Sequence, residues 1–403
     1  MSELARLLGD PQDAYPVIHL TGTNGKGSTA RMLTCLLSAR GLRVGTYTSP
    51  DLERVNERLA LAGRPIDDHD LCEVLARVAD AASVMEDSPT RFEILTAAAF
   101  SWFADEAVDA AVVEVGLGGR RDATNIVHGR VAVVTNVALD HAEVIGPSLA
   151  DIATEKAGIV EPGSTLVLGE TEPALASIFR SAGAAQVWER HREFGCEANR
   201  VAHGGRLLDL RTPGARYPEV YLPLHGVHQG DNAACALAAA EAFFGAPLDP
   251  GVVTEAMAEV TSPGRMEVVG RRPLCLLDGA HNPAGARAAG ATLDEEFGAI
   301  RRRVVVMGLL QGRDPVEMLE ALGVPPLGAV VACRPPSPRA MPPAEVAAAA
   351  RRLGVAAEVV DDPVAALARA RARARSEDLV LVTGSLYVVG AVRAGLRGRP
   401  HRP

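Results

Sequence analysis

A glycine-rich segment near the start of the chain has the residue types that hold the phosphates of a nucleotide. Residues 21–29 read Thr-Gly-Thr-Asn-Gly-Lys-Gly-Ser-Thr, after an apolar run at 17–20 and before a helical pattern at 30–39. Small residues let backbone N–H groups close around phosphate oxygens, the start of a helix adds partial positive charge, and Lys26 adds a full charge. The segment therefore predicts a binding site for a nucleoside triphosphate.

This segment differs from the common Walker pattern, which has a glycine five positions before the Gly-Lys pair and Ser or Thr directly after the lysine. Here Leu20 stands where that glycine would be, and Gly27 separates Lys26 from Ser28. The alternative is a glycine-rich turn that binds no ligand. Turn chemistry alone does not explain Gly-Lys-Gly-Ser-Thr between a strand and a helix, so we favour the phosphate site.

Three further polar residues, Ser49, Glu114 and His141, come at or just after the ends of expected strands. In open α/β sheets, ligands bind at the carboxyl ends of the strands. A hydroxyl, a carboxylate and an imidazole, together with phosphate oxygens, could hold Mg²⁺ there. The alternatives are a turn hydroxyl for Ser49, a salt bridge from Glu114 to Arg120 or Arg121, and a helix-start role for His141.

Other candidates stand on helices or in loops, where their residue type alone decides little. Lys156 lies on an expected helix and by itself would be taken for a surface lysine. Asn232 follows a loop with two histidines, and its alternative role is helix capping. Arg265 lies at an expected hinge, from which a guanidinium can reach phosphates. In the second half of the chain, strand-end residues recur at 278–283 and 383–387.

Composition excludes several classes of protein. The chain has 403 residues, is 48% hydrophobic and carries a formal charge of -9. The acidic balance argues against a nucleic-acid-binding protein. No run of 18 uncharged apolar residues exists, so we expect no membrane association, and the first residues lack a secretion signal. Six cysteines without paired spacing indicate idle thiols, so we expect a cytoplasmic protein. We also expect a monomer.

The elements that position these residues alternate between apolar strands and helices, which predicts an α/β fold with mostly parallel sheets covered on both faces. A more polar stretch at 186–222 predicts a small antiparallel excursion, and a linker is expected near 261–265. We therefore predict two domains, 1–262 with the ATP site and a Rossmann-like 263–403, with ligands in the cleft between them. The first domain is expected to have strands at 17–20, 44–47, 110–115, 131–136 and 165–168 and helices at 70–82, 93–104 and 231–244. The second is expected to have strands at 274–277, 303–307, 329–332, 358–360 and 379–383 and helices at 284–297, 315–322, 343–353 and 363–375.

Taken together, these segments resemble the Mur ligase superfamily and, within it, the folylpolyglutamate synthase/dihydrofolate synthase family. Nine matches occur in the same order and cover most of the chain, which is far more specific than any single motif. The matching segments are Gly22–Ser28, Thr48–Pro50, Glu114–Asn125, Leu139–His141, Glu155–Gly158, His228–Asn232, Pro263–Arg265, Asp278–Pro283 and Gly384–Tyr387.

The resemblance implies ATP-dependent amide bond formation between a folate-type carboxylate and L-glutamate, through an acyl phosphate, by a P-loop ATPase domain and a Rossmann-like glutamate-ligase domain. It implies ATP and Mg²⁺ as cofactors and a carbamylated Lys156. The nucleotide residues would be Thr23, Asn24, Gly25, Lys26, Gly27, Ser28, Asn232, Arg265 and Asp278, and the metal ligands Ser49, Glu114 and His141. The catalytic residues would be Lys26, Lys156, Arg265 and His281. The substrate residues would be Thr90, Arg91, Phe92, Glu93, Arg121, Asp122, Ala123, His281 and Ser385.

The chain departs from the usual sequence of the family at two places, both in the part that would bind the carboxylate acceptor. Members of the family usually carry a longer segment before the P-loop strand, and they often have His after Ser-Pro, where this chain has Asp51. These departures favour, as an alternative, a ligase of the same superfamily that acts on a non-folate carboxylate. A second alternative is a nucleotide-binding switch without ligase activity. The strand-end residues of the second domain argue against it, because a switch needs no second substrate domain.

Overall fold

In the computed structural model, which describes residues 1–300, 302–323 and 328–398, the chain forms two compact units. The first comprises Met1–Asp51, Val55–Pro223 and His228–Thr261, and the second comprises Leu52–Arg54, Leu224–Val227 and Ser262–Pro403. The boundary between Thr261 and Ser262, after which the chain stays in the second unit, lies in the expected linker. Two short segments that precede this linker nevertheless belong to the second unit, which no pattern in the sequence predicts.

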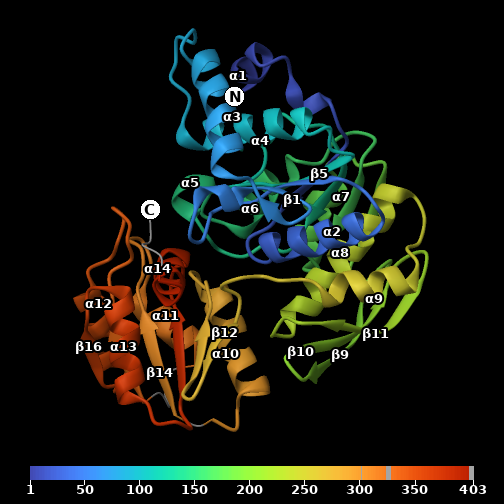
Figure 1. Cartoon of the computed structure of the whole chain (residues 1–403). Coiled ribbons are helices and arrows are strands. Elements are labelled where there is room, and N and C mark those ends of the chain that lie inside the picture. Colours follow the sequence, from blue (N-terminus) through green and yellow to red (C-terminus); the bar gives the residue numbers. More distant parts are fainter. Residues whose placement is uncertain (301, 324–327, 399–403) are drawn as a thin grey trace. The chain divides into compact units, whose positions relative to one another are not determined.

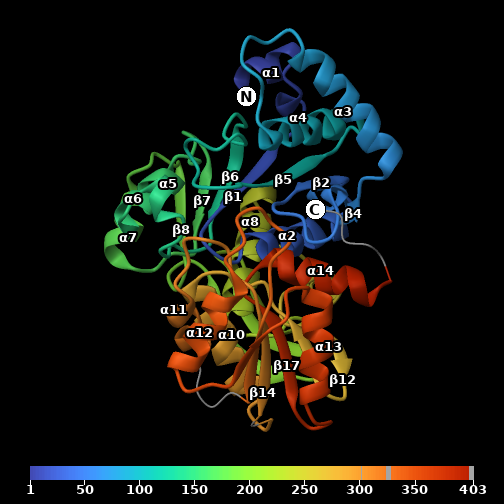
Figure 2. The same cartoon turned by 90° about the vertical axis from the view of Figure 1, so that its left-hand side faces the viewer.

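The first unit is built on an eight-stranded sheet, as far as its described residues show, with the order β4-β3-β2-β5-β1-β6-β7-β8. Figure 2 shows β1 in the middle, between β5 and β6. All neighbours are parallel except the β2–β3 and β3–β4 pairs. The strands are β1 (Val17–Thr21), β2 (Val44–Tyr47), β3 (Leu59–Leu61), β4 (Arg64–Pro65), β5 (Ala110–Glu114), β6 (Gly129–Val134), β7 (Thr165–Leu168) and β8 (Gln186–Glu189).

Helices cover both faces of this sheet (Figure 1), as expected for strands that are apolar along their whole length. Helix α2 packs against α8, and α3 packs against α4. The helices are α1 (Ser2–Leu7), α2 (Lys26–Ala39), α3 (Asp68–Ala82), α4 (Arg91–Asp105), α5 (Ala142–Ile145), α6 (Leu149–Ala157), α7 (Pro173–Arg180), α8 (His228–Phe244) and α9 (Pro250–Ala258), with short 3₁₀ turns η1 (Pro11–Asp13) and η2 (Val55–Arg58).

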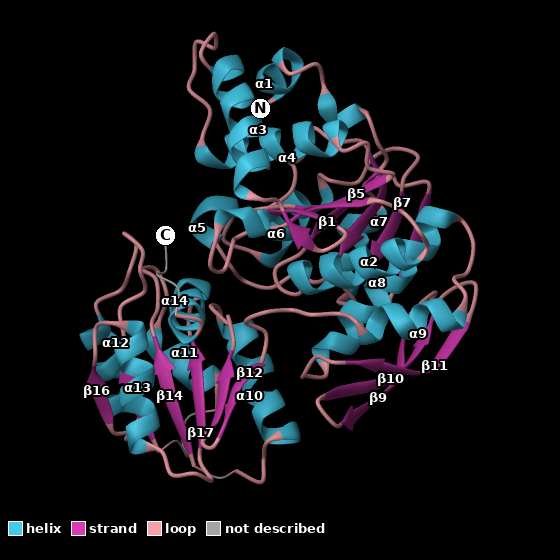
Figure 3. Ribbon diagram, viewed as in Figure 1, coloured by secondary structure: helices cyan, strands magenta, loops and turns pink. Residues whose placement is uncertain are grey.

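A three-stranded antiparallel sheet follows β8 and corresponds to the expected excursion. It has the order β11-β10-β9, from β9 (Gly195–Ala202), β10 (Gly205–Arg211) and β11 (Arg216–Leu222). Figure 3 shows these strands beside α9, and α8 packs against β9 and β10.

The second unit has, among its described residues, a six-stranded sheet in the order β12-β13-β17-β14-β15-β16, in which only the β12–β13 pair is antiparallel. Its strands are β12 (Glu267–Arg271), β13 (Leu274–Leu277), β14 (Arg303–Met307), β15 (Ala329–Ala332), β16 (Ala357–Val359) and β17 (Leu379–Thr383). Its helices are α10 (Pro283–Glu296), α11 (Pro315–Ala321), α12 (Pro343–Arg352), α13 (Pro363–Arg373) and α14 (Leu386–Leu396).

The predicted α/β fold with mostly parallel sheets is confirmed, and the ends of the predicted elements lie within four residues of the observed ones. The sequence did not reveal the antiparallel strands β3, β4 and β12, because a strand as short as Arg64–Pro65 leaves no periodic pattern to detect. All six cysteines are free thiols. In the part of the chain that the structure describes, no helix has the length and apolar character needed to cross a bilayer.

Candidate functional site

The glycine-rich segment forms the predicted strand–turn–helix. β1 ends at Thr21 and α2 begins at Lys26, with Gly25 as the N-cap in the left-handed conformation (φ 85°). Lys26 Nζ donates hydrogen bonds to the carbonyl oxygens of Gly22 (3.0 Å) and Thr23 (3.4 Å). The ammonium group therefore lies against its own loop, at the positively polarised start of α2, where a phosphate group would bind.

Two residues at the end of β6 hold this loop in shape, and sequence reasoning missed both. Asn24 N–H donates to Asn136 Oδ1, and Asn136 Nδ2 donates to the Asn24 carbonyl oxygen, both at 3.0 Å. Thr135 Oγ1 donates to the same carbonyl oxygen at 2.7 Å. Their position at the carboxyl end of a strand was a usable signal, but only the strand order places that end beside the loop.

Asn232 lies directly beside the loop. A Cβ atom added at Gly25 would come within 2.3 Å of Asn232 Oδ1, and Asn232 Nδ2 donates to Gln229 Oε1 at 2.9 Å. The capping alternative is wrong, because α8 begins at His228 and Asn232 stands in its second turn. Two segments far apart in the sequence thus meet at the loop.

We expect Gly25→Ala to weaken nucleotide binding at least tenfold, because the new methyl group would collide with Asn232 in a loop that must fit closely around phosphates. Gly41→Ala is the matched control, since Gly41 has a similar φ of 88° but no atom within 4 Å of an added Cβ. Both variants place alanine at a positive φ, which costs about 1–3 kcal/mol of backbone strain, so this cost is shared by the variant and its control. Calorimetry measures the affinity of each variant for ATP. Equal affinities of the two variants would contradict the expectation.

Glu114 and Ser49 lie together next to the loop. Glu114 is the last residue of β5 and is 3% exposed, and Ser49 N–H donates to Glu114 Oε2 at 3.3 Å. The same carboxylate oxygen is 3.5 Å from the position of a Cβ atom at Gly27. A buried carboxylate beside the phosphate loop is costly unless a cation or hydrogen-bond donors compensate it. This donor set of carboxylate and hydroxyl oxygens fits a hard divalent cation such as Mg²⁺.

His141 has a left-handed backbone conformation (φ 50°), which is uncommon outside glycine. Its ring nitrogens lie 3.7 Å from Asp140 Oδ1 and 3.8 Å from Glu143 Oε1. Backbone strain at a non-glycine residue persists when the surrounding structure holds it, and such residues cluster at functional sites.

Lys156 is buried in α6, only 4% exposed, and is not a surface lysine. Burial, and then the positive charge of Lys26, lower the pKa of its amine from 10.5 to about 7, and Asp140 opposes this shift. Lys156 thus belongs to the same electrostatic group as Lys26 and the Asp140–His141 pair. An amine with this pKa is about half in its neutral, nucleophilic form at pH 7.

The segment predicted to contact the acceptor has mixed roles. Thr90 and Glu93 form a capping box at the start of α4, which explains both residues structurally. The ring of Phe92 covers Gly116, and its centroid lies 6.0 Å from that of Tyr47. Arg91 and Arg121 are exposed, and Ala123 is partly exposed.

Asp122 is held in place by its neighbours. Its carboxylate accepts hydrogen bonds from Thr124 N–H and Thr124 Oγ1 and from Leu117 N–H, at 2.6–2.9 Å. Burial raises the pKa of this carboxyl group against these hydrogen bonds. Asp122 therefore organises the loop between Gly116 and Thr124.

In the second unit, Asp278 directly follows β13, and Arg265 stands just before β12, the antiparallel partner of β13. Asp278 is buried and accepts hydrogen bonds from Met266 N–H (3.0 Å) and Ala280 N–H (2.9 Å). Arg265 Nη1 is 3.0 Å from the position of a Cβ atom at Gly279. The strand end therefore brings a carboxylate and a guanidinium close together.

His281 and Ser385 precede two helices at the carboxyl ends of the neighbouring strands β13 and β17. Gly384 N–H donates to the Ala280 carbonyl oxygen at 3.0 Å, which ties the two strand ends together. His281 Nδ1 lies 2.9 Å from the Gly279 carbonyl oxygen, and Ser385 caps α14 through Tyr387 N–H at 3.2 Å. Two helix starts side by side favour an anionic group.

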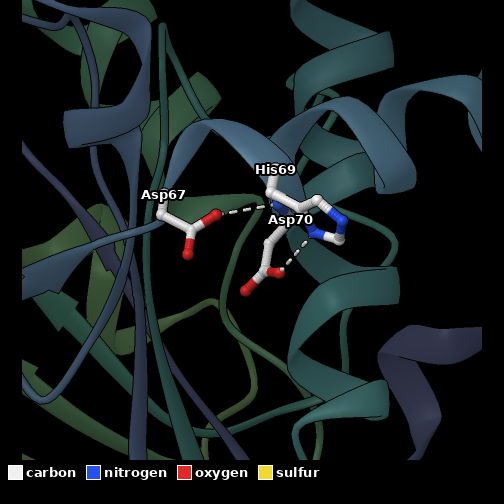
Figure 4. Close-up of side chains that lie close together, drawn as sticks. All are labelled: Asp67, His69 and Asp70. Atoms are coloured by element: carbon white, nitrogen blue, oxygen red, sulfur yellow. Dashed lines mark hydrogen bonds and ion pairs between the residues drawn. The ribbon is translucent and has the colours of Figure 1, made fainter.

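One group of acidic and histidine side chains among the described residues has the close spacing of metal ligands, and it lies elsewhere. Figure 4 shows Asp67, His69 and Asp70 at the start of α3, where Asp67 caps the helix through Asp70 N–H at 2.9 Å. Helix capping explains Asp67, and His69 is largely exposed.

Comparison with known protein families identifies two matching regions. Residues 20–240 match the Mur ligase middle domain, and residues 264–386 match the Mur ligase glutamate ligase domain.

Individual proteins give the same result. The chain is 40% identical, over 98% of its length and 88% of the relative's, to a dihydrofolate synthase/folylpolyglutamate synthase of Mycobacterium tuberculosis. It superposes with a TM-score of 0.87 and 31% identity on E. coli FolC in complex with DHPP and ADP, covering 98% of this chain and 92% of that one. A bifunctional folylpolyglutamate synthase/dihydrofolate synthase from Yersinia pestis, complexed with AMPPNP and Mn ion, gives a TM-score of 0.85 and 30% identity, with the same coverage.

Proposed function

We propose, since this chain belongs to the Mur ligase family and within it to the dihydrofolate synthases/folylpolyglutamate synthases, that it joins L-glutamate to a folate-type carboxylate at the expense of ATP. The observation that carries this proposal is the convergence of three distant segments on the phosphate loop. Asn232 lies beside Gly25, Glu114 beside Gly27, and the charge of Lys26 acts on Lys156.

The first unit would bind the nucleotide and a divalent cation. Thr23 to Ser28 and Asn232 would surround the triphosphate, as their position at the start of α2 supports. Ser49, Glu114 and His141 would hold Mg²⁺, with a carbamylated Lys156 contributing a carboxylate close by. The cation, when bound, would neutralise phosphate charge.

The chemical problem is that a carboxylate does not condense with an amine in water. In the proposed reaction the acceptor carboxylate attacks the γ-phosphorus of ATP, and ADP leaves. Lys26 and Arg265 would offset the charge that develops on the phosphoryl oxygens. The amine of glutamate then attacks the acyl phosphate, phosphate leaves, and an amide remains.

The second unit would bind glutamate. The start of α14 at Ser385, next to His281, offers hydrogen-bond donors to a carboxylate. Arg265 and Asp278 would contact the nucleotide, as the resemblance to the family implies. The acceptor would lie against Phe92 and the loop from Arg121 to Ala123.

We expect release of ADP and phosphate to require both the acceptor and glutamate. The measurement is a coupled ADP assay with either dihydropteroate or folate monoglutamate as the acceptor, in which the acceptor and glutamate are each omitted in turn. ADP formation at the full rate without glutamate would contradict the proposed order of steps, because the acyl phosphate is consumed only by the amine.

Mass spectrometry of the intact products would identify the acceptor. Dihydrofolate as product defines a dihydrofolate synthase, and a lengthened glutamate tail defines a folylpolyglutamate synthase. The replacement of the expected histidine by Asp51, which forms an ion pair of 2.6 Å with Arg58, is an observation that favours a non-folate acceptor. Turnover of neither folate compound would favour that alternative.

A further inference from the structure

Two polar side chains are buried in the central strand of the first unit. His19 and Thr21 of β1 are both 0% exposed, and the strand is otherwise apolar. Residues two apart in a strand point to the same face of the sheet. Burying polar groups costs free energy unless they are hydrogen-bonded. The two side chains therefore call for a common explanation.

Both side chains contact the same loop, the segment 116–124 that follows β5. His19 Nε2 lies 2.9 Å from Thr124 Oγ1, and Thr21 Oγ1 donates to the Gly118 carbonyl oxygen at 2.7 Å. The contact continues to Asp122, because Thr124 Oγ1 donates to Asp122 Oδ1 at 2.6 Å. One face of β1 thus holds the loop near both of its ends.

The hydrogen-bond directions fix the state of the histidine. Because the Thr124 hydroxyl proton is given to Asp122, the hydroxyl oxygen must accept from His19, so Nε2 carries the proton. Among the described residues, no group is hydrogen-bonded to His19 Nδ1, as expected for a neutral ring. Burial lowers the pKa of His19 to about 3, so the ring keeps this state across the working pH range.

We propose that His19 and Thr21 are positioning residues, which fix the loop 116–124 to the strand that carries the phosphate loop. β1 ends at Thr21, and Gly22 begins the phosphate loop directly afterwards. The same strand would then set both the position of the ATP phosphates and the position of Asp122. This inference rests on the proposed function, which places Asp122 against the acceptor. A carboxylate that must attack phosphorus needs both partners held in fixed positions.

The test is the kinetics of His19→Leu, which removes the donor but fills a similar volume. We expect KM for the acceptor to rise about tenfold and kcat to fall about tenfold, because a small misplacement of reacting groups costs up to about a hundredfold in rate. The dissociation constant of ATP should change less than threefold. His19→Gln, whose amide nitrogen can donate to Thr124, should recover most of the loss.

Ile18→Val is the matched control, because Ile18 is equally buried on the other face of the same strand. It should lower the melting temperature without a selective effect on the acceptor. If His19→Leu and Ile18→Val change KM for the acceptor and the dissociation constant of ATP in the same proportions, the positioning role is overturned. The positioning role is also overturned if His19→Gln has the melting temperature of the wild type but does not recover the lost activity.

Amide hydrogen exchange separates this proposal from the proposed function, because it needs no substrate. In His19→Leu, the peptide covering 116–124 should exchange at least tenfold faster, while a peptide covering the start of α2 should exchange as in the wild type. Unchanged exchange at 116–124 would overturn the inference even if the wild type ligates glutamate. Faster exchange in a chain with no activity on any folate acceptor would support the contact and refute only the proposed acceptor.

Discussion

Replacing Lys26 by methionine is expected to lower kcat for glutamate ligation by roughly 10²–10³-fold, the range found when one preorganised charge-stabilising donor is removed from an active site. The ammonium group is held at the start of α2 by the Gly22 and Thr23 carbonyl oxygens. Methionine keeps the length of the side chain and removes the charge. Steady-state ADP release with saturating substrates is the measurement, and a matching melting temperature shows that the fold is intact.

The same substitution has a second, independent consequence. The charge of Lys26 lowers the pKa of Lys156, so Lys26→Met should raise that pKa. The mechanism would be in doubt if Lys26→Met kept more than a tenth of the wild-type kcat. The electrostatic account would be wrong if the pKa of Lys156 did not change, whatever happened to the rate.

Lys156 also shows what the sequence could and could not tell. On an expected helix it was indistinguishable from a surface lysine, yet the whole sequence contains only two lysines, Lys26 and Lys156. All the other basic residues that make up the Lys+Arg total of 41 are arginines. An ammonium group and a guanidinium group are not interchangeable, since only the amine loses its proton readily when buried. The rarity of lysine was therefore a usable signal that this position needs an amine.

The core of the fold followed from the sequence because continuous apolar strands and helix patterns depend on local periodicity. The contacts of the residues around the phosphate loop could not be predicted from the sequence. Thr135 and Asn136 hold Asn24 only because β6 pairs with β1, and His19 reaches Thr124 only because the loop after β5 folds over the same strand. Such contacts depend on strand order and register, which no single segment contains.

Replacing Lys156 by methionine is expected to inactivate the enzyme and stabilise it at the same time. On the proposed role of Lys156 as a metal-binding carbamate, its loss should lower kcat by roughly 10²-fold or more. Stability should change in the opposite direction. The pKa of Lys156 is about 7 in the folded chain and 10.5 in the unfolded one, so the unfolded state binds more protons between these values. The free energy of unfolding of the unmodified protein therefore rises with pH between 7 and 10.5.

The full effect of that pKa difference is about 5 kcal/mol, which the folded protein loses as the pH falls to 7. Lys156→Met should remove this pH dependence and unfold at higher urea concentration than the wild type at pH 7 in carbon-dioxide-free buffer. Urea unfolding at pH 7 and pH 10 measures both effects. Lys156→Arg is the matched control, because it keeps the charge and cannot be carbamylated, so it should be inactive without being stabilised.

Bicarbonate then distinguishes a carbamate from a plain buried amine. Carbamylation converts the neutral amine of Lys156 and CO₂ into a carbamate anion and a proton. The charge of Lys26 would attract this anion, whereas it repels the ammonium form of Lys156. Bicarbonate should therefore stabilise the wild type at pH 7 and leave Lys156→Met unchanged. With lysine as the only ¹⁵N-labelled residue, two side-chain signals are expected, and Lys26→Met assigns them. If bicarbonate changes neither the Lys156 signal nor the unfolding midpoint, Lys156 acts as an amine and the proposed carbamate is wrong.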